Sequence, residues 1–274
     1  MPATRRGVAV VGAGRAGQAR MRALEASPRA RLAAVVTRGD PLAPVLADPE
    51  VTAVIVCTPN ALHAGAARAA LAAGKHVAVE FPLAATAPEA SALFAAACAR
   101  GLVLHEEHIE LLSPSQAALR VQARLLGPPR AGSVRFSGDS AGWIGDPALA
   151  GSPALGALAR LHRLVDLFGP AELRGARLGA GALRRLEVEL AFAGGGVVTL
   201  VEERGPGLAR STDWSIECAR GRLATPPPEP PGALFARDLE VFLDRIESGA
   251  ESYVSDARVL ELLELVGAIE RRLC

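Results

Sequence analysis

Val8-Ala-Val-Val-Gly-Ala-Gly-Arg-Ala-Gly17 runs from four apolar residues straight into a glycine-rich turn. The apolar residues are typical of a buried parallel strand, and the residues at 15–26 predict the helix that follows. In such a unit, Gly12 permits the tight turn, Gly14 lets a pyrophosphate approach the backbone, and Gly17 lets the helix pack against the strand. The stretch therefore predicts a dinucleotide-binding turn.

The first N–H groups of the predicted helix have no partners within the helix, so they are free to face a phosphate. We therefore expect the turn and the helix start to hold the pyrophosphate of the cofactor. The residues concerned are Gly12, Gly14, Arg15, Ala16 and Gly17.

Strand and helix patterns alternate along the first part of the chain. Apolar runs predict strands, and Ala-rich segments that stop at glycine predict helices. The strands are expected at 8–11, 32–36, 54–57, 76–80 and 102–105, and the helices at 15–26, 61–73 and 88–100. This alternation predicts a parallel Rossmann sheet in a domain spanning 1–110.

The pattern changes after this point. Residues 107–126 are predicted to be helical with a break at Pro114, and 152–168 to form another helix. Strands joined by Gly-rich turns are expected at 133–137, 173–178, 185–192, 196–203 and 214–219, followed by a Pro-rich linker at 226–231 and helices at 233–247 and 255–273. We therefore predict an α/β chain whose second domain, 111–274, is α+β with a large, mostly antiparallel sheet.

The end of the second predicted strand bears on the choice of cofactor. An NAD site usually has a carboxylate there, whereas this chain has Thr37-Arg38. A guanidinium suits the 2′-phosphate of NADPH, so we expect Thr37 and Arg38 to favour NADPH. Asp40 lies two residues further and leaves NADH open. The alternative is that Arg38 is a solvated loop charge.

The segment Gly74-Lys-His-Val-Ala-Val-Glu-Phe-Pro82, after Thr58-Pro-Asn-Ala-Leu-His63, resembles the glucose–fructose oxidoreductase/inositol dehydrogenase superfamily. Sugar-oxidising members have a catalytic lysine where this chain has Phe81, and Lys75 is the only lysine here. Their later D-x-x-x-H-x-x-D motif is also absent, because its positions hold Leu155, Ala159 and His162. Sugar oxidation by the usual mechanism is therefore not expected.

The chain resembles the biliverdin reductase branch, which lacks that lysine, over nearly its whole length. The shared stretches are 11–17, 74–82, 103–112, 152–169 and 202–208. The resemblance implies reduction of the central methine bridge of biliverdin to bilirubin, a step of heme catabolism, with NADPH as hydride donor. Two alternatives remain: a non-catalytic NAD(P)-binding sensor or scaffold of the same fold, and an oxidoreductase acting on another small substrate.

The resemblance also implies the site residues. Glu80 would orient the nicotinamide or relay a proton, and Phe81 would form an apolar wall beside the substrate. Arg160 would contact the tetrapyrrole and assist its protonation, with Arg163 one helical turn further. Additional cofactor contacts are expected from Thr58, Pro59, Asn60 and His63. The simpler alternatives are a helix cap for Glu80, a core residue for Phe81 and a surface ion pair for Arg160.

Acids flanked by histidines follow the fifth predicted strand in His105-Glu-Glu-His108. Glu107 and Glu110 are three residues apart and are expected to share a helix face, where they would line the substrate pocket or form a polar cluster between the domains. The segment lacks the His pair at i, i+4 of a helical zinc site, so no metal is expected.

Composition narrows the partners and the location. The formal charge is +1 without a clustered basic stripe, so nucleic acid is not expected as a partner. No apolar run approaches the roughly 20 residues of a membrane span. Four widely separated cysteines and a strand that begins by Val8, leaving no room for a signal peptide, predict reduced thiols in the cytoplasm. We expect a monomer with a small bilin substrate, and a higher oligomer is left open.

Overall fold

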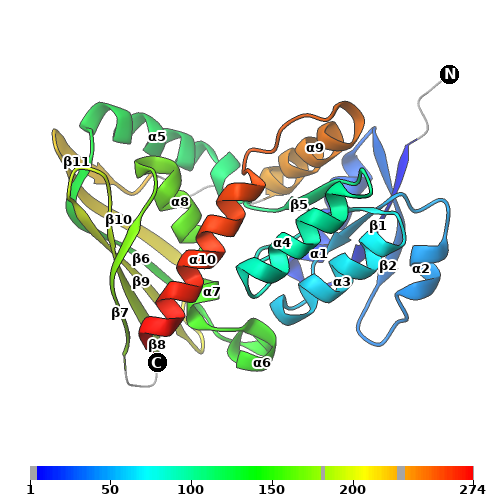
Figure 1. Cartoon of the computed structure of the whole chain (residues 1–274), viewed down its shortest axis with the longest axis horizontal. Coiled ribbons are helices and arrows are strands. Elements are labelled where there is room, and N and C mark those ends of the chain that lie inside the picture. Colours follow the sequence, from blue (N-terminus) through cyan, green and yellow to red (C-terminus); the bar gives the residue numbers. More distant parts are fainter. Residues whose placement is uncertain (1–4, 180–182, 227–231, 274) are drawn as a thin grey trace. The chain divides into compact units, whose positions relative to one another are not determined.

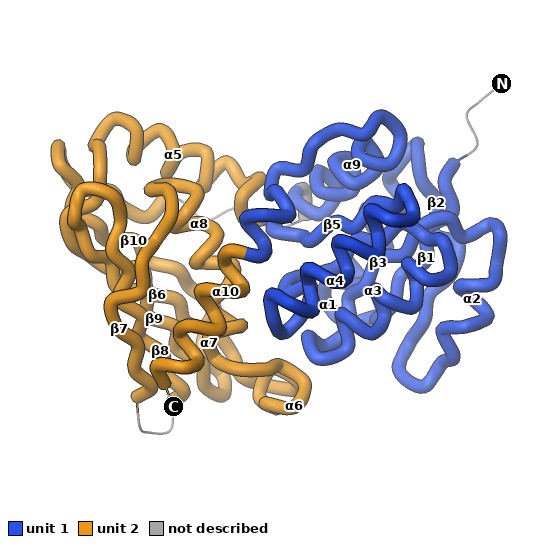
Figure 2. The backbone as a smooth tube through the Cα atoms, viewed as in Figure 1, with its two compact units in different colours: residues 1–109, 230–260 blue, residues 110–229, 261–274 orange. Residues whose placement is uncertain are grey.

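The computed structural model describes residues 5–179, 183–226 and 232–273 (Figure 1). The linker predicted at 226–231 lies, apart from Pro226, outside the described residues. The chain forms two compact units (Figure 2): unit 1 comprises 1–109 and 230–260, and unit 2 comprises 110–229 and 261–274. The prediction that all of 111–274 belongs to one second domain is therefore wrong for 230–260.

Unit 1 is built on a five-stranded parallel sheet in the order β2-β1-β3-β4-β5. Its strands are β1 (Arg6–Val11), β2 (Ala30–Val36), β3 (Ala53–Val56), β4 (His76–Val79) and β5 (Leu104–Glu106). Its helices are α1 (Arg15–Ala26), α2 (Ala43–Ala47), α3 (His63–Ala72), α4 (Ala87–Cys98) and α9 (Gly232–Ser248), with a 3-10 turn η1 (Asn60–Leu62). The parallel Rossmann sheet is confirmed.

The core of unit 1 explains why α9 belongs to it. Val8 and Ile55 of the sheet, Leu24 of α1, and Leu239 and Phe242 of α9 are all buried in one apolar cluster. These side chains leave water together, and each fully buried one contributes about 1.5–3 kcal/mol. Helix α9 therefore covers one face of the sheet beside α1, although more than 200 residues separate them in the sequence.

Unit 2 is built on a six-stranded sheet in the order β11-β10-β6-β9-β8-β7. Its strands are β6 (Pro129–Asp139), β7 (Glu172–Gly179), β8 (Arg184–Ala191), β9 (Val197–Gly205), β10 (Ser211–Cys218) and β11 (Gly221–Ala224). All neighbouring pairs are antiparallel except β6 and β9, which are parallel. The predicted mostly antiparallel sheet is confirmed.

The helices of unit 2 follow the prediction only in part. They are η2 (Ile109–Leu112), α5 (Pro114–Leu126), η3 (Gly142–Gly145), α6 (Pro147–Ala150), α7 (Pro153–Gly156) and α8 (Leu158–Phe168), and α10 (Asp256–Leu273) begins in unit 1 and ends in unit 2. The helix predicted at 152–168 is interrupted at Ala157. The break predicted at Pro114 is confirmed, because Ser113 caps α5 by accepting from the backbone N–H of Gln116.

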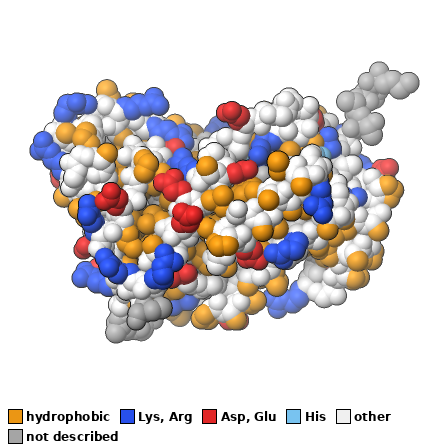
Figure 3. All heavy atoms as spheres, in the orientation of Figure 1, with side chains coloured by type: hydrophobic (Ala, Val, Ile, Leu, Met, Phe, Trp, Pro, Cys, Tyr) orange, Lys and Arg blue, Asp and Glu red, His pale blue; other side chains and the backbone are white. Residues whose placement is uncertain are grey.

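Charge is distributed without a large patch of one sign on the face of the molecule in Figure 3, where basic and acidic side chains are interspersed. Among the described helices, none combines the length and the apolar character that crossing a membrane requires.

Candidate active site

The glycine turn between β1 and α1 has the geometry of a phosphate cradle. Gly12 has φ 104°, and a Cβ there would lie 2.4 Å from the carbonyl oxygen of Cys57. A Cβ on Gly17 would lie 1.9 Å from the Gly12 carbonyl oxygen, whereas one on Gly14 would meet nothing within 4 Å. Gly12 and Gly17 are therefore required by the packing of the protein, and Gly14 leaves open space for a ligand.

The beginning of α1 is also suited to an anion. Gly14 is the N-cap and offers no side-chain cap, and the first turn contains no acidic residue. Arg15 is exposed and Ala16 is half-buried at this end. The free N–H groups and the helix dipole favour a negatively charged group here. The turn thus fits the pyrophosphate of a dinucleotide.

The loop after β2 carries Arg38 and Asp40, and only the arginine side chain is left without a partner among the described residues. The backbone N–H and the hydroxyl of Thr37 donate to Asp40 Oδ2 at 2.8 and 2.5 Å. These two bonds lower the pKa of Asp40. Arg38 is exposed and forms no ion pair or hydrogen bond with the described residues. Asp40 is therefore engaged in its own turn, and Arg38 is available to a ligand.

The end of β3 is fixed to the end of β4 by a histidine. His63 is buried, and its ring nitrogens lie 2.8 Å from the Pro82 carbonyl oxygen and 2.7 Å from that of Thr58. Pro59 and Asn60 lead into η1 between these contacts. His63 thus links the loop after β3 to the loop after β4, and both of its ring nitrogens are used in these backbone contacts. The hydroxyl of Thr58 is buried with no hydrogen-bond partner in the described chain, which suits a hydrogen bond to a bound cofactor at this edge.

Glu80 and Phe81 follow β4. Oε1 of Glu80 accepts a hydrogen bond from Nε of Arg20 at 2.9 Å and lies 2.9 Å from Nη2 in an ion pair, and the Glu80 side chain is 16% exposed. It caps none of the helices that the structure describes. The ring of Phe81 is half-buried and stacks on that of His108, with centroids 5.4 Å apart and an interplanar angle of 19°. Phe81 therefore offers part of an apolar ring to the carboxyl edge of the sheet.

Glu107 and Glu110 do not share a helix face, contrary to the prediction. The N–H of Glu107 donates to the Val79 carbonyl at 2.9 Å, which extends the pairing of β4 and β5, and helical structure begins only at Ile109. Glu107 lies in unit 1 and Glu110 in unit 2. The backbone conformation after β5 therefore separates the two acids.

The two glutamates also differ in their electrostatic environment. Burial, followed by the charge of Glu80, raises the pKa of Glu107 well above its usual value. For Glu110, burial opposes ionisation, but the charges of Arg160, Arg163 and Arg210 outweigh it and lower the pKa. Glu107 is thus favoured as the neutral acid, and Glu110 as the carboxylate.

Arg160 of α8 lies in a buried ion pair in unit 2. Its Nε donates to Glu202 Oε2 at 3.1 Å and its Nη2 to Glu202 Oε1 at 2.8 Å, and both side chains are 2% exposed. The guanidinium lies 4.2 Å from the centre of the Phe136 ring and also donates to the Gly156 carbonyl. The alternative of a surface ion pair for Arg160 is therefore wrong, because the pair is buried.

Arg163 lies on the same side of α8. Its guanidinium is 4.8 Å from the Trp214 ring centre, its Nε donates to Gln116 at 2.8 Å, and its Nη1 is 3.5 Å from Glu110. Phe136 pairs with Thr212 in the sheet, two residues before Trp214, so both rings lie on the face that α8 covers. The two arginines therefore pack on neighbouring strands.

Further arginines complete this cluster. Arg204 donates to Glu202 at 2.9 Å, and Arg210 to Glu110 at 2.6 Å. Both guanidiniums also lie near the Phe136 ring, at 4.8 and 5.7 Å from its centre. Four arginines (160, 163, 204 and 210) thus face two glutamates (110 and 202), an excess of two positive charges within the cluster.

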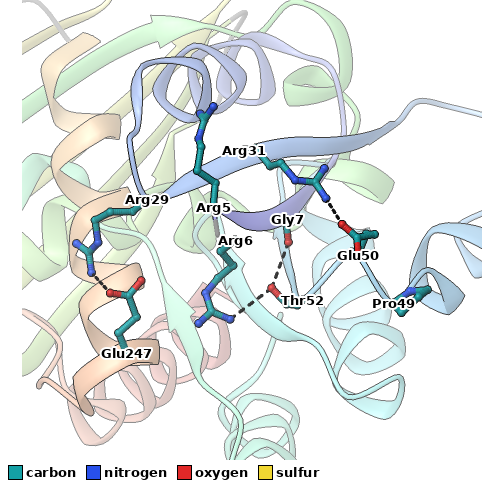
Figure 4. A pocket seen from close by; sticks show the side chains of 9 residues that line it. All are labelled: Arg5, Arg6, Gly7, Arg29, Arg31, Pro49, Glu50, Thr52 and Glu247. Carbon is teal, nitrogen blue, oxygen red and sulfur yellow. Dashed lines mark hydrogen bonds and ion pairs between the residues drawn. The ribbon is translucent and has the colours of Figure 1, made fainter. Parts of the chain in front are cut away.

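A cavity of about 260 Å³ lies elsewhere in unit 1 (Figure 4). It is lined by the residues that begin β1 and β2 and precede β3, at the amino edge of the sheet, whereas the glycine turn is at the carboxyl edge. Two of its arginines form ion pairs: Arg29 pairs with Glu247 at 2.7 Å and Arg31 with Glu50 at 2.6 Å. We assign this cavity no role in nucleotide binding.

Several residues at the site were not singled out in the sequence. Arg20 and Asp238 are fully buried and are paired across 218 positions, which no local pattern reveals. Glu202 lies within a stretch that carried the resemblance, but its pairing with Arg160 depends on the sheet register. Local spacing therefore located the glycine turn, and tertiary packing determined the buried charged groups.

Comparison with known proteins agrees with this geometry. Residues 6–108 match the oxidoreductase family with an NAD-binding Rossmann fold. Biliverdin reductase A of Mus musculus is 32% identical over 293 residues, covering 98% of this chain and 97% of the mouse protein. The Homo sapiens enzyme of the same name is 31% identical over 295 residues, covering 100% and 98%.

Solved structures show the same fold. Biliverdin reductase from Synechocystis sp. PCC 6803, in complex with biliverdin and NADP⁺, superimposes with a TM-score of 0.82 at 24% identity, covering 98% of this chain and 99% of that chain. A putative myo-inositol dehydrogenase from Sinorhizobium meliloti gives 0.84 at 19% identity, covering 98% and 97%. This chain therefore belongs to the family of NAD(P)H-dependent Rossmann oxidoreductases that includes biliverdin reductase A.

Proposed function

We propose that this oxidoreductase reduces biliverdin at its central methine bridge to bilirubin, with NADPH as the hydride donor. A hydride passes from the nicotinamide to the methine carbon, a proton reaches the neighbouring pyrrole nitrogen, and NADP⁺ is released. The supporting similarity is the match to biliverdin reductase A over nearly the whole chain.

The observation that carries the proposal is the residue after Glu80. Phe81 occupies the position of the lysine of sugar-oxidising relatives and presents an apolar ring. Lys75 does not replace it, because its Nζ donates to the carbonyls of Asp48 and Val51 at 2.9 and 2.7 Å, before β3 and β4 begin. A flat apolar surface suits a conjugated tetrapyrrole better than a sugar.

The arginine cluster of unit 2 supports the same substrate class. Its excess of two positive charges matches the two propionates of biliverdin, and carboxylates bind guanidiniums well. Arg210 is 64% exposed on its side chain and is the most accessible of the four arginines. We propose that Arg160 and Arg163 act on the substrate from this cluster, with Arg160 assisting protonation of the pyrrole.

The residues of unit 1 fit the cofactor. We propose that the glycine turn binds the pyrophosphate and Arg38 the 2′-phosphate, while Thr58, Asn60 and Glu80 contact the nicotinamide half. When bound, the cofactor supplies the hydride. Pro59 and His63 shape the loops that carry these contacts. The three cysteines for which the structure describes the sulfur (57, 98 and 218) are free thiols, which is compatible with the cytoplasmic location that we propose.

The test is a spectrophotometric assay of the purified protein with biliverdin and either NADPH or NADH. We expect loss of the biliverdin absorbance, growth of the bilirubin absorbance, and oxidation of one NADPH per biliverdin. The matched control is Gly14→Asp, which places a negative charge against the phosphates. If the wild-type protein binds NADPH but leaves biliverdin unchanged, another substrate has to be sought.

A further inference from the structure

A buried chain of charged groups lies behind Glu80 in unit 1. Arg20 of α1 is 1% exposed and donates from Nη1 to Oδ2 of Asp238 at 2.5 Å. Asp238, on α9, is fully buried. The same guanidinium donates from Nε to Oε1 of Glu80, and its Nη2 lies 2.9 Å from that oxygen in an ion pair. One arginine therefore links a helix from near the end of the chain to the end of β4.

The other oxygen of Asp238 is also held. Oδ1 accepts from the Tyr253 hydroxyl at 2.6 Å and lies 2.8 Å from Nε2 of His105. Nδ1 of His105 faces a guanidinium nitrogen of Arg245 at 3.4 Å, so Nδ1 accepts and Nε2 carries the hydrogen. Burial opposes ionisation of Asp238, but the charge of Arg20 and the bonds from His105 and Tyr253 outweigh it and hold its pKa well below the usual range.

Among these linked charged groups, Glu80 has a partly exposed side chain, which lies at the carboxyl edge of the sheet. Arg20, Asp238 and His105 are buried to within 1%. Oε2 of Glu80 has no hydrogen-bond partner among the residues that the structure describes. This oxygen is therefore available to a bound molecule, while Oε1 is fixed from behind.

The sheet order indicates which part of the cofactor reaches Glu80. In the order β2-β1-β3-β4-β5, Arg38 follows β2, the glycine turn follows β1, and Glu80 follows β4. A dinucleotide lies across the carboxyl ends of such a sheet with its pyrophosphate at the turn. With the adenosine half toward β2, the nicotinamide half lies toward β3 and β4.

We propose that Arg20 and Asp238 are positioning residues that orient the carboxylate of Glu80 toward the nicotinamide half of the cofactor. Asp238 holds Arg20 in one orientation, and Arg20 holds Glu80. A nicotinamide ring is positively charged when oxidised and neutral when reduced, so a carboxylate beside it favours NADP⁺ over NADPH. The positioning pair thereby sets the relative affinity for the two forms, whatever the second substrate is.

Calorimetric titration of the full-length protein with NADP⁺ and with NADPH tests this proposal without any turnover. Glu80→Gln should weaken NADP⁺ binding several-fold more than NADPH binding. Asp238→Asn should shift the NADP⁺/NADPH affinity ratio in the same direction, because Arg20 loses its anchor. The double variant Glu80→Gln, Asp238→Asn should have an affinity ratio within twofold of that of Glu80→Gln alone. Asp238 affects the ratio only through Glu80, so its substitution has little further effect once the Glu80 carboxylate is gone.

Two further variants separate positioning from general support of the fold. Glu240→Gln alters another acid of α9, which pairs with Arg29 on the surface, and should leave the affinity ratio unchanged. Tyr253→Phe removes one hydrogen bond to Asp238 without changing any charge, so it should shift the NADP⁺/NADPH affinity ratio in the same direction by a smaller factor. This variant provides the test if Asp238→Asn does not fold. Equal weakening of both nucleotides, or full additivity of Asp238→Asn with Glu80→Gln, would overturn the proposal. Because the readout is cofactor affinity, failure of the biliverdin assay does not bear on it.

Discussion

Arg160 and Glu202 form a two-point ion pair in the interior of unit 2, with both guanidinium-to-carboxylate distances near 3 Å. Burial raises the pKa of Glu202, while the charges of Arg160 and Arg204 oppose this rise. Removing one partner of such a pair leaves the other as an uncompensated buried charge, which costs far more than the intact pair contributes. A substitution of Arg160 therefore affects stability as well as any chemistry, and the two effects have to be measured separately.

Arg160→Ala should destabilise the protein by about 3 kcal/mol, near the lower end for a broken buried pair because Arg204 still contacts Glu202. Urea unfolding measures this loss. The double variant Arg160→Ala, Glu202→Gln should recover part of it, because no buried carboxylate is left unpaired. If the double variant is less stable than Arg160→Ala alone, the ion pair is not the cause.

The same variants separate stability from the proposed chemistry. If Arg160 assists protonation of the substrate, single turnover of biliverdin should fall about 10²–10⁴-fold in both variants, while NADPH affinity changes little. The rate is measured well below the unfolding temperature of each variant. Normal turnover in the folded double variant would mean that Arg160 has only a structural role.

Substitutions in the glycine turn should separate folding from cofactor binding. Gly12→Ala and Gly17→Ala place a Cβ against backbone atoms and should lower the unfolding temperature. Gly14→Ala meets open space and should fold normally, whereas Gly14→Asp should fold but lose nucleotide affinity through charge repulsion. Thermal unfolding with and without NADPH measures both effects. Unchanged NADPH affinity in folded Gly14→Asp would contradict the assignment of the turn.

Arg38 should distinguish the two cofactors. Its guanidinium has no partner in the described residues, and Asp40 is held by Thr37. Arg38→Ala should therefore weaken NADPH roughly ten- to hundredfold, as expected for a charged hydrogen bond, and leave NADH almost unaffected. Competitive binding of both nucleotides measures the ratio. Equal losses for NADPH and NADH would show that Arg38 does not contact the 2′-phosphate.

The outward face of the sheet in unit 2 predicts a monomer. Its exposed or half-buried side chains include Arg135, Arg177, Arg185 and Arg222 together with Asp213, Glu187, Glu189, Glu203 and Glu217. Several pair with one another, as Arg185 does with Glu187 at 2.7 Å. A stable subunit interface is usually depleted of charge at its centre. Light scattering should give the mass of one chain, and a concentration-independent dimer would contradict this prediction.

Local sequence patterns predicted those parts of the fold that depend on local interactions. Helix α1 begins and ends where the pattern indicated, and the glycine turn has the expected form. Short elements were not predicted, among them α2, which has five residues, and β11, which has four with only Leu223 buried. Such elements carry too few apolar positions to show a period.

Long-range pairing accounts for the larger errors. Helix α9 looks like any amphipathic helix in the sequence, but Asp238 on it is the partner of Arg20, and this buried pair contributes to its place in unit 1. Glu107 was expected to begin a helix, yet its N–H donates to the carbonyl of Val79 on the neighbouring strand. For α9 tertiary contacts determine which unit the helix joins, and for Glu107 a tertiary contact outweighs the local preference.

Glu107 and Glu110 should respond to pH with opposite sign, although they are three residues apart. Burial raises the folded-state pKa of Glu107, so the native state keeps its proton at pH values where the unfolded chain has lost it. Its contribution to stability is therefore full below the unfolded pKa of about 4.3 and is lost as the pH rises through the folded pKa. The loss amounts to about 1.4 kcal/mol per pH unit across that window.

Glu107→Gln removes this titration and keeps the shape of the side chain. The free energy of unfolding of this variant, relative to wild type, should therefore increase between pH 5 and pH 8 in urea titrations. Glu110→Gln is the matched control. The folded-state pKa of Glu110 is lowered by its arginines, so its contribution is present above the unfolded pKa and is lost as the pH falls through the folded pKa. Glu110→Gln should accordingly destabilise the protein at pH 7 and less so in acid. If Glu107→Gln differs from wild type by a constant amount over this pH range, the Glu107 carboxyl is not held neutral by burial.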